Sequence, residues 1–424
     1  MKRFQLAILA IICSVAAPLV ALRGEVARVP RFPLGLPERN IPRWEQLDPA
    51  CLGTRWQDIK PAMQSFVDYG TILGAVTLVD RRGSPLQTDA VGAFAPDTIF
   101  QVMSMAKPIV SVLVLKLIED GKIPSSETRV VTLPGFADFP YRDVTIKRLL
   151  THTSGIWYRR DLAPGVRAGV APHLTNKFDK EPETSTRDKT LDFVARHYAN
   201  ATLYPLGSTD YHYSNMGFMM LGWIVERLHG KPFEVVAKEQ IFEPLGLTDT
   251  FYFPQSATPG QRKRIADLDR RLSDPPDYDH YKKTRPGWRY VSPEGGLHST
   301  ARDLRQFMGL LRHRGQLPGG SRVLKSESVE RLLRDEAPDK NAGYNAGVGR
   351  SLGFYVAREP APAELPGFDP GTVSHGGRFA TEFWYNPKKD EIGIFLCQMV
   401  QRTPEPTPTD GVADAFKQIL ARIK

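Results

Sequence analysis

One segment of the chain predicts a central buried helix: Ser104-Met-Ala-Lys-Pro-Ile-Val-Ser-Val-Leu-Val-Leu-Lys-Leu-Ile-Glu-Asp-Gly121. Between Ser104 and Asp120 apolar residues lie on nearly every side of a helix, which is typical of burial in the centre of a protein. Pro108 fits the first turn, and Gly121 is a common helix stop. A spacing of three places the Ser104 hydroxyl and the Lys107 amine on one face.

Ser104 and Lys107 form a Ser-x-x-Lys motif. A serine hydroxyl becomes a good nucleophile only when a base removes its proton. A buried lysine can assist, because burial lowers its pKa from about 10.4. The helix N-terminus adds N–H groups that favour a developing oxyanion. Taken alone, the motif equally fits an ordinary helix cap beside a solvated lysine.

A second motif is Tyr213-Ser-Asn215. A tyrosine held near a lysine can become a phenolate and act as a general base, and an asparagine amide can orient the lysine and the substrate. The alternative is the end of a tyrosine-rich strand, Tyr211-His-Tyr213, followed by an asparagine helix cap.

A third motif is His375-Gly376-Gly377, which precedes a predicted strand. Two glycines let a ligand approach the backbone closely. The alternative is a plain glycine turn. None of the three motifs indicates a particular protein family when taken alone. Their occurrence together, in this order along the chain, does.

In this order the motifs resemble those of the serine β-lactamase and penicillin-binding-protein-like family, in its class C-like branch with a tyrosine base. That branch includes β-lactamases, DD-carboxypeptidases, D-aminopeptidases and β-lactamase-related esterases. The resemblance covers residues 50–422. Further matching phrases are Leu149-Leu-Thr-His-Thr-Ser-Gly155, Pro244-Leu-Gly-Leu247, Gly295-Gly-Leu297 and Ser299-Thr-Ala-Arg-Asp303.

The resemblance implies a role for each motif residue. Ser104 would be the acylated nucleophile, Lys107 and Tyr213 would exchange its proton, and Asn215 would position them. The oxyanion hole would consist of the N–H groups of Ser104 and Arg378. The residues expected to bind substrate are Asn215, His375, Gly376, Gly377 and Arg378. His152 is expected to be a structural turn residue.

His375 departs from the β-lactamases, which usually carry lysine at that position and use its charge to hold a substrate carboxylate. A neutral imidazole holds a carboxylate weakly at pH 7. The resemblance therefore favours esterases and D-amino-acid amidases. Arg378 could restore the positive charge, so carboxylate binding stays open.

The pattern of predicted elements is mixed, then helical, then strands followed by a helix. It indicates an α/β (α+β) fold, and the resemblance implies an antiparallel sheet flanked by helices with an inserted, mainly helical region. The predicted catalytic domain covers residues 45–424, with the sheet part at 45–140 and 291–424 and the insertion at 141–290. Predicted strands cover 72–80, 87–91, 352–356, 381–385 and 391–400, and predicted helices cover 104–120, 190–198, 216–229 and 412–424.

The amino terminus has the features of an export signal. Met1-Lys2-Arg3 is basic, and an apolar run follows up to residue 22. Cleavage after Ala21 would place Leu19 where a small residue is preferred, so an uncleaved membrane anchor is an alternative. Residues 23–44, rich in proline and arginine, are a predicted linker. We expect a periplasmic or secreted protein.

The composition excludes several classes. The chain has 424 residues, is 41% hydrophobic and carries a formal net charge of +9. The basic residues are scattered, which disfavours nucleic acid as a partner. No zinc-type Cys/His spacing and no Gly-x-Ser-x-Gly elbow occur, so no metal or cofactor is expected. Cys51 and Cys397 are the only cysteines outside the apolar run, and they either pair or remain two thiols.

The expected function is an exported serine hydrolase that cleaves an ester or amide bond through an acyl-enzyme on Ser104. Small esters are the first expected substrates, peptides or amides of D-amino acids the second, and β-lactams the third. The partner would be a small molecule, with membrane contact only through a retained N-terminal segment. The alternative is a non-catalytic cell-envelope protein that binds through the long polar loops predicted at residues 157–188 and 254–290.

Overall fold

The computed structural model describes residues 54–156, 191–192, 195, 211–252, 256–268, 291–336, 347–359, 367–399 and 408–423. The signal, the linker and Cys51 lie outside these residues, as do most of the predicted helix at 190–198 and all of 157–188. Cys397 is buried. In the described part of the chain no helix is long and apolar enough to cross a membrane.

The described residues form an antiparallel seven-stranded sheet with the order β2-β1-β9-β8-β7-β6-β5. The centre of the sheet joins two segments that are far apart in the sequence, because Val76 on β1 pairs with Leu396 on β9. A short second sheet pairs β3 with β4. The strands are β1 (Gly74–Arg81), β2 (Gln87–Gly92), β3 (Phe100–Gln101), β4 (His298–Ser299), β5 (Val348–Arg350), β6 (Tyr355–Ala357), β7 (Val373–Gly377), β8 (Thr381–Asn386) and β9 (Glu391–Leu396).

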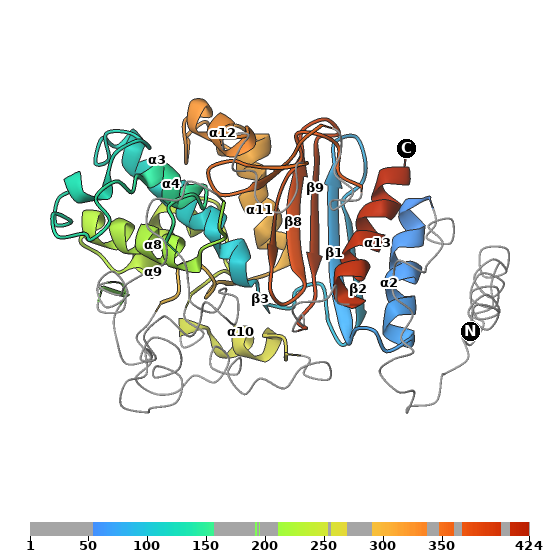
Figure 1. Cartoon of the computed structure of the whole chain (residues 1–424). Coiled ribbons are helices and arrows are strands. Elements are labelled where there is room, and N and C mark those ends of the chain that lie inside the picture. Colours follow the sequence, from blue (N-terminus) through green and yellow to red (C-terminus); the bar gives the residue numbers. More distant parts are fainter. Residues whose placement is uncertain are drawn as a thin grey trace, which may run out of the picture.

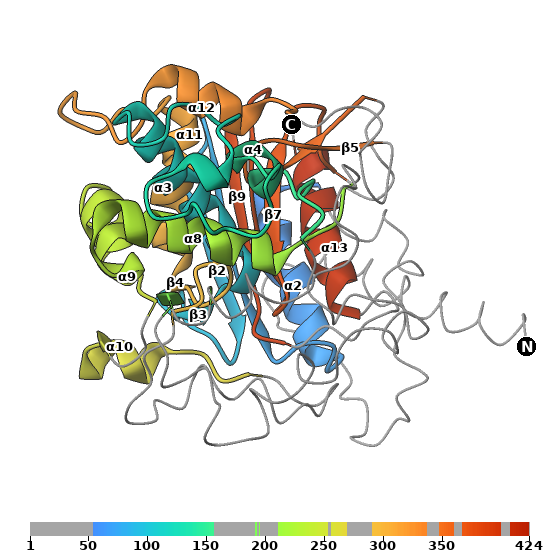
Figure 2. The same ribbon diagram turned by 60° about the vertical axis from the view of Figure 1, so that its left-hand side comes forward.

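Helices cover both faces of the sheet. Figures 1 and 2 show α2 and α13 on one face, with α11 and the helical region containing α3 and α8 on the other. The α-helices are α2 (Ile59–Asp68), α3 (Lys107–Glu119), α4 (Ile146–Leu150), α8 (Asn215–His229), α9 (Phe233–Ala237), α10 (Pro259–Arg264), α11 (Ala301–Arg312), α12 (Ser326–Leu333) and α13 (Pro408–Arg422). Short helical turns are η4 (Trp56–Asp58), η5 (Met103–Ala106), η6 (Val130–Thr132) and the π-helix η10 (Lys238–Phe242).

The strand pleat sends neighbouring residues into two separate cores. On β1, Val76 and Leu78 join the core with α3, α8 and α11, whereas Ala75 and Val79 join the core with α2 and α13. The helix predicted at 104–120 is the centre of the first core, and nearly all of α3 is buried. The predicted fold class is confirmed.

Some predicted elements were wrong. The strand predicted at 352–356 is interrupted, and only its end belongs to β6. Gly353 has a φ of 120°, and a Cβ there would lie 2.1 Å from Ser111 Oγ on α3. The chain therefore turns between β5 and β6. The helices α11 and α12 were not predicted, although Thr300 caps α11 by accepting a hydrogen bond from Asp303 N at 3.2 Å. Within 254–290, part of the predicted loop forms α10.

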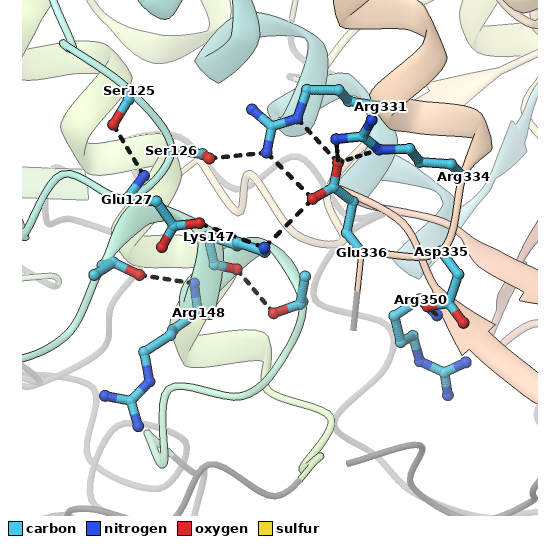
Figure 3. Close-up of polar contacts among 12 residues, drawn as sticks. Ser125, Ser126, Glu127, Lys147, Arg148, Arg331, Arg334, Asp335, Glu336 and Arg350 are labelled. Carbon is cyan, nitrogen blue, oxygen red and sulfur yellow. Dashed lines mark hydrogen bonds and ion pairs between the residues drawn. The ribbon is translucent and has the colours of Figure 1, made fainter. Parts of the chain in front are cut away.

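An ion cluster around Glu336 links α12 to α4. The Glu336 carboxylate lies 3.0 Å from Arg331 Nε, 2.8 Å from Arg334 and 3.4 Å from Lys147 Nζ. Figure 3 shows these three cations converging on the one carboxylate. The Glu336 side chain is only 4% exposed. The cluster therefore ties the helical region to the segment that leads into β5.

Candidate active site

Ser104 lies in the η5 turn that leads into α3. The preceding residue, Met103, has a φ of 51°, in the left-handed region that a non-glycine side chain seldom adopts. Strained residues of this kind gather at functional sites, where the surrounding structure holds them in place. Ser104 is half-buried, so its hydroxyl is within reach of a small molecule.

Lys107 is fully buried at the start of α3. Its Nζ donates to Ser104 Oγ at 3.0 Å, to Asn215 Oδ1 at 2.8 Å and to the Glu294 carbonyl oxygen at 3.1 Å. A lysine ammonium has three N–H bonds, so these three acceptors fix its position, and loss of one proton leaves an electron pair directed at Ser104 Oγ. The structure thus brings the first two sequence motifs together on Ser104.

Tyr213 precedes α8 and forms a hydrogen bond with Ser104. Lys107 Nζ lies 4.8 Å from the centroid of its ring. Burial, with a smaller contribution from Tyr355, raises the pKa of Tyr213 well above its usual value, and the Ser104 hydrogen bond opposes that shift only in part. In the resting protein Tyr213 is therefore a phenol that keeps its proton.

His152 supports the tyrosine from behind. It lies in the turn after α4 with a φ of 59°, and its Nδ1 accepts a hydrogen bond from Ser214 N at 3.0 Å. Its ring centroid is 4.6 Å from that of Tyr213. Burial, followed by the charge of Lys107, lowers the pKa of His152 well below its usual value, so the ring stays neutral. These contacts are those of a positioning residue.

The third motif precedes the predicted strand, which is β8, and itself lies within β7, a strand that was not predicted. Gly377 must lack a side chain, because a Cβ there would lie 2.2 Å from the Val102 carbonyl oxygen. Gly377 therefore lets β7 pack beside the turn that carries Ser104. A Cβ at Gly376 would meet only an ordinary contact at 3.7 Å. Of the two glycines, the protein's own packing requires Gly377.

His375 is buried, and its Nδ1 lies 2.8 Å from the Gly376 carbonyl oxygen. That contact makes Nδ1 the protonated nitrogen. Burial, with the charge of Lys107 second, lowers the pKa of His375 to about 3. The imidazole is therefore neutral at pH 7 and cannot supply a positive charge to a carboxylate. Arg378 directly follows β7 and is half-buried.

Two charged residues of the site were missed in the sequence. Glu294 precedes the Gly295-Gly-Leu297 phrase, and its carbonyl oxygen holds Lys107. Burial raises the pKa of its carboxyl group, while the charge of Lys107 opposes the shift, and its Oε2 has no hydrogen-bond partner. Arg350 on β5 is 6% exposed, and its charge contributes to the lowered pKa values of His152 and His375. The Gly295-Gly-Leu297 phrase stands beside Glu294 and could have marked it, whereas no local motif marks Arg350.

The arrangement joins a nucleophilic hydroxyl, a buried amine and a phenol. No cluster of His, Cys, Asp or Glu side chains that could hold a metal ion occurs within the described residues. The chemistry available to these groups is proton transfer to and from Ser104, which suits acyl transfer to the serine.

Comparison with known proteins identifies the family. The model of the beta-lactamase family matches residues 59–416, so this chain belongs to the beta-lactamase family. Protein Rv1367c of Mycobacterium tuberculosis is 27% identical over 86% of this chain and 94% of its own length. Esterase EstB of Burkholderia gladioli is 29% identical over 77% of this chain and 85% of its own length. In structure, the chain is similar to EstCE1, a hydrolase with promiscuous acyltransferase activity, with a TM-score of 0.65 and 21% identity. That match covers 86% of this chain and 97% of EstCE1.

Proposed function

We propose that this protein is an exported serine hydrolase that cleaves carboxylic esters through an acyl-enzyme on Ser104. The observation that carries the proposal is the 3.0 Å contact between Lys107 Nζ and Ser104 Oγ inside a buried site. The neutral His375 cannot hold the carboxylate of a β-lactam at the position where the family's usual lysine does, which favours an ester. Its relative EstB is itself named an esterase.

The proposed reaction begins from the neutral amine of Lys107: Ser104 Oγ attacks the ester carbonyl carbon, and its proton passes to the free electron pair of Lys107 Nζ. The Oγ–C bond forms as the carbonyl π electrons move onto oxygen. The C–O bond to the alcohol then breaks, and Tyr213 gives its proton to the leaving oxygen. Lys107 returns a proton to Tyr213. Water attacks the acyl-enzyme by the same route, and Ser104 recovers its proton.

Labelling with a fluorophosphonate tests the nucleophile. We expect the intact protein to be modified at Ser104 and Ser104→Ala to remain unlabelled while keeping its unfolding midpoint. A stable adduct on another residue would exclude the assignment. No adduct at all would favour a non-catalytic binding protein on this fold.

A substrate panel tests the ester preference. We expect p-nitrophenyl esters to be cleaved with a higher kcat/KM than D-alanyl amides and a chromogenic cephalosporin. The second candidate is an amidase for D-amino acids, which the partnerless Glu294 Oε2 favours, because a carboxylate can accept from a substrate ammonium. A higher kcat/KM for the D-alanyl amide would select this second function.

Export is tested separately. We propose that the apolar run up to residue 22 directs the chain out of the cytoplasm. N-terminal sequencing of the protein recovered from the periplasm or medium would identify a cleavage site. Recovery of the intact N-terminus in the membrane fraction would indicate an anchor, and recovery in the cytoplasm would refute export.

A further inference from the structure

We propose that Arg350 binds a carboxylate carried by the substrate and so makes this site selective for anionic esters. This inference rests on the proposed esterase function and names the substrate class of the same site. Arg350, and not His375 or Arg378, would then be the positive charge that meets the substrate, at a place separated from His375 by the Tyr355 ring.

The first argument is the position of the guanidinium. Arg350 Cζ lies 4.1 Å from the ring centroid of Tyr211 and 3.9 Å from that of Tyr355. The Tyr355 ring is in turn 5.1 Å from the His375 ring, and the His375 ring is 6.3 Å from Tyr213. Arg350 is therefore separated from the third motif by a single aromatic ring.

The second argument is an unbalanced charge. Arg350 Nη1 donates to the Gly349 carbonyl oxygen at 2.8 Å and the guanidinium bonds to Tyr211, but Nε has no partner. Burial raises the pKa of Tyr211 well above its usual value, so this phenol stays neutral. In the described part of the chain no carboxylate forms an ion pair with Arg350. A buried charge is normally paired, because an unpaired one is costly.

The third argument is that the nearest carboxylates pair with other cations. Asp335 accepts from the backbone N of Arg350 at 3.1 Å, but its side chain pairs with Arg358 at 2.5 Å. Glu336 is engaged by the ion cluster, and its backbone N donates to the Arg350 carbonyl oxygen at 2.7 Å. Figure 3 shows the Arg350 guanidinium pointing away from Glu336. The backbone of Arg350 is thus anchored while its charge faces the tyrosines of the site.

A planar fork of N–H donors between two rings suits a carboxylate, which accepts two parallel hydrogen bonds. The Tyr211 and Tyr355 rings both pack against the guanidinium, so little side-chain entropy is lost on binding. The carboxylate can belong to the acyl group or to the leaving group, and either would place an anion beside Arg350.

The test compares esters with and without a carboxylate. One pair differs in the acyl group: p-nitrophenyl hydrogen glutarate and p-nitrophenyl valerate. The other pair differs in the leaving group: p-butyryloxybenzoate and phenyl butyrate. The measured quantity is the kcat/KM for the anionic ester divided by that for its neutral counterpart. We expect Arg350→Met to lower this ratio about 10- to 100-fold in at least one pair, as for loss of a charged hydrogen bond.

Two further variants control the test. Arg350→Lys keeps the charge but lacks the planar set of N–H donors, and it should give an intermediate ratio. The same variant serves as the test if Arg350→Met does not fold. Arg129→Met changes an exposed arginine and should leave both ratios as in the unaltered protein. If Arg350→Met or Arg350→Lys reduces anionic and neutral esters equally, the ratio stays fixed and Arg350 is only structural. If neither ester of a pair is cleaved even by the unaltered protein, the proposed function fails instead.

Discussion

His152 Nδ1 accepts a hydrogen bond from the backbone N–H of Ser214 at 3.0 Å, and this contact ties the turn after α4 to the residue between Tyr213 and Asn215. We expect His152→Ala to destabilise the protein by about 1–3 kcal/mol, because a buried N–H loses its acceptor. The kcat should fall as well, since Tyr213 loses the ring that packs against it.

His152→Asn is the matched variant for this prediction. Asparagine supplies a side-chain oxygen as acceptor and tolerates the positive φ of residue 152. Urea unfolding and ester kinetics on both variants separate the roles. If both variants lose activity while their unfolding midpoints stay unchanged, His152 would have a chemical role.

Tyr213→Phe removes one hydroxyl and keeps the ring that contacts His152. Because this phenol is the proposed donor to the leaving oxygen, we expect kcat/KM to fall about 100- to 10,000-fold. The loss should be smaller for p-nitrophenyl esters, whose leaving group needs little protonation, than for alkyl esters. A variant within threefold of the unaltered enzyme on both would mean that Lys107 works alone.

Glu294→Gln tests the carboxylate beside Lys107. A negative charge there favours the protonated amine and raises the pKa of Tyr213. Removing it favours the deprotonated form of either group. The acidic limb of the pH profile of kcat/KM should therefore move to lower pH, by about one unit. A limb that stays in place or moves upward would show that Glu294 is protonated in the working enzyme.

The ionisation of His375 should make no contribution to the pH profile of kcat/KM. Its pKa of about 3 means that it is neutral throughout the range from pH 5 to 8. His375→Gln can change the rate, but the acidic limb should remain at the same pH. A limb that shifts or disappears in this variant would assign it to the imidazole.

Glu336→Gln tests the ion cluster. Burial opposes ionisation of this carboxyl group, but hydrogen bonds and charges from Arg331 and Arg334 outweigh it and lower its pKa. A lowered pKa contributes stability above the unfolded value of about 4.3, and this contribution is lost as pH falls through the folded value. We expect the variant to lose about 2 kcal/mol near pH 7, since both arginines stay partly solvated.

The control for this variant is to repeat the unfolding measurement at several pH values. The difference in unfolding free energy between Glu336→Gln and the unaltered protein should shrink as the pH is lowered toward 3. A difference that is constant with pH would show that the cluster contributes packing and not charge.

Those features of the site that depend on residues close together in the sequence could be predicted. Ser104 in the η5 turn and Lys107 at the start of α3 are three residues apart, so their contact follows from helical geometry. The amide of Asn215 and the imidazole of His375 were placed through motifs. Arg350 was not found, because its importance comes from two tyrosines on different segments. A charge becomes significant only when folding buries it, and no local pattern records that.

The missed elements have similarly specific causes. Gly353 interrupts a predicted strand because α3 packs against its backbone, which is a long-range constraint. The start of α11 carries a capping threonine, Thr300, and an acidic first turn at Asp303. These are ordinary helix signals. No element was predicted at residues 301–312, although these signals stand there, so the error was one of interpretation.

The pairing of β1 with β9 has a consequence for synthesis on the ribosome. The nucleophile at Ser104 is made early, but the strand β7 beside it belongs to a sheet that β9 completes, and α13 covers that sheet last. A nascent chain that already contains Ser104, Lys107 and Tyr213 therefore still lacks β7, the strand that packs beside Ser104. Contacts so distant along the chain form slowly. Hydrolytic activity should thus appear only after β9 and α13 have been synthesised.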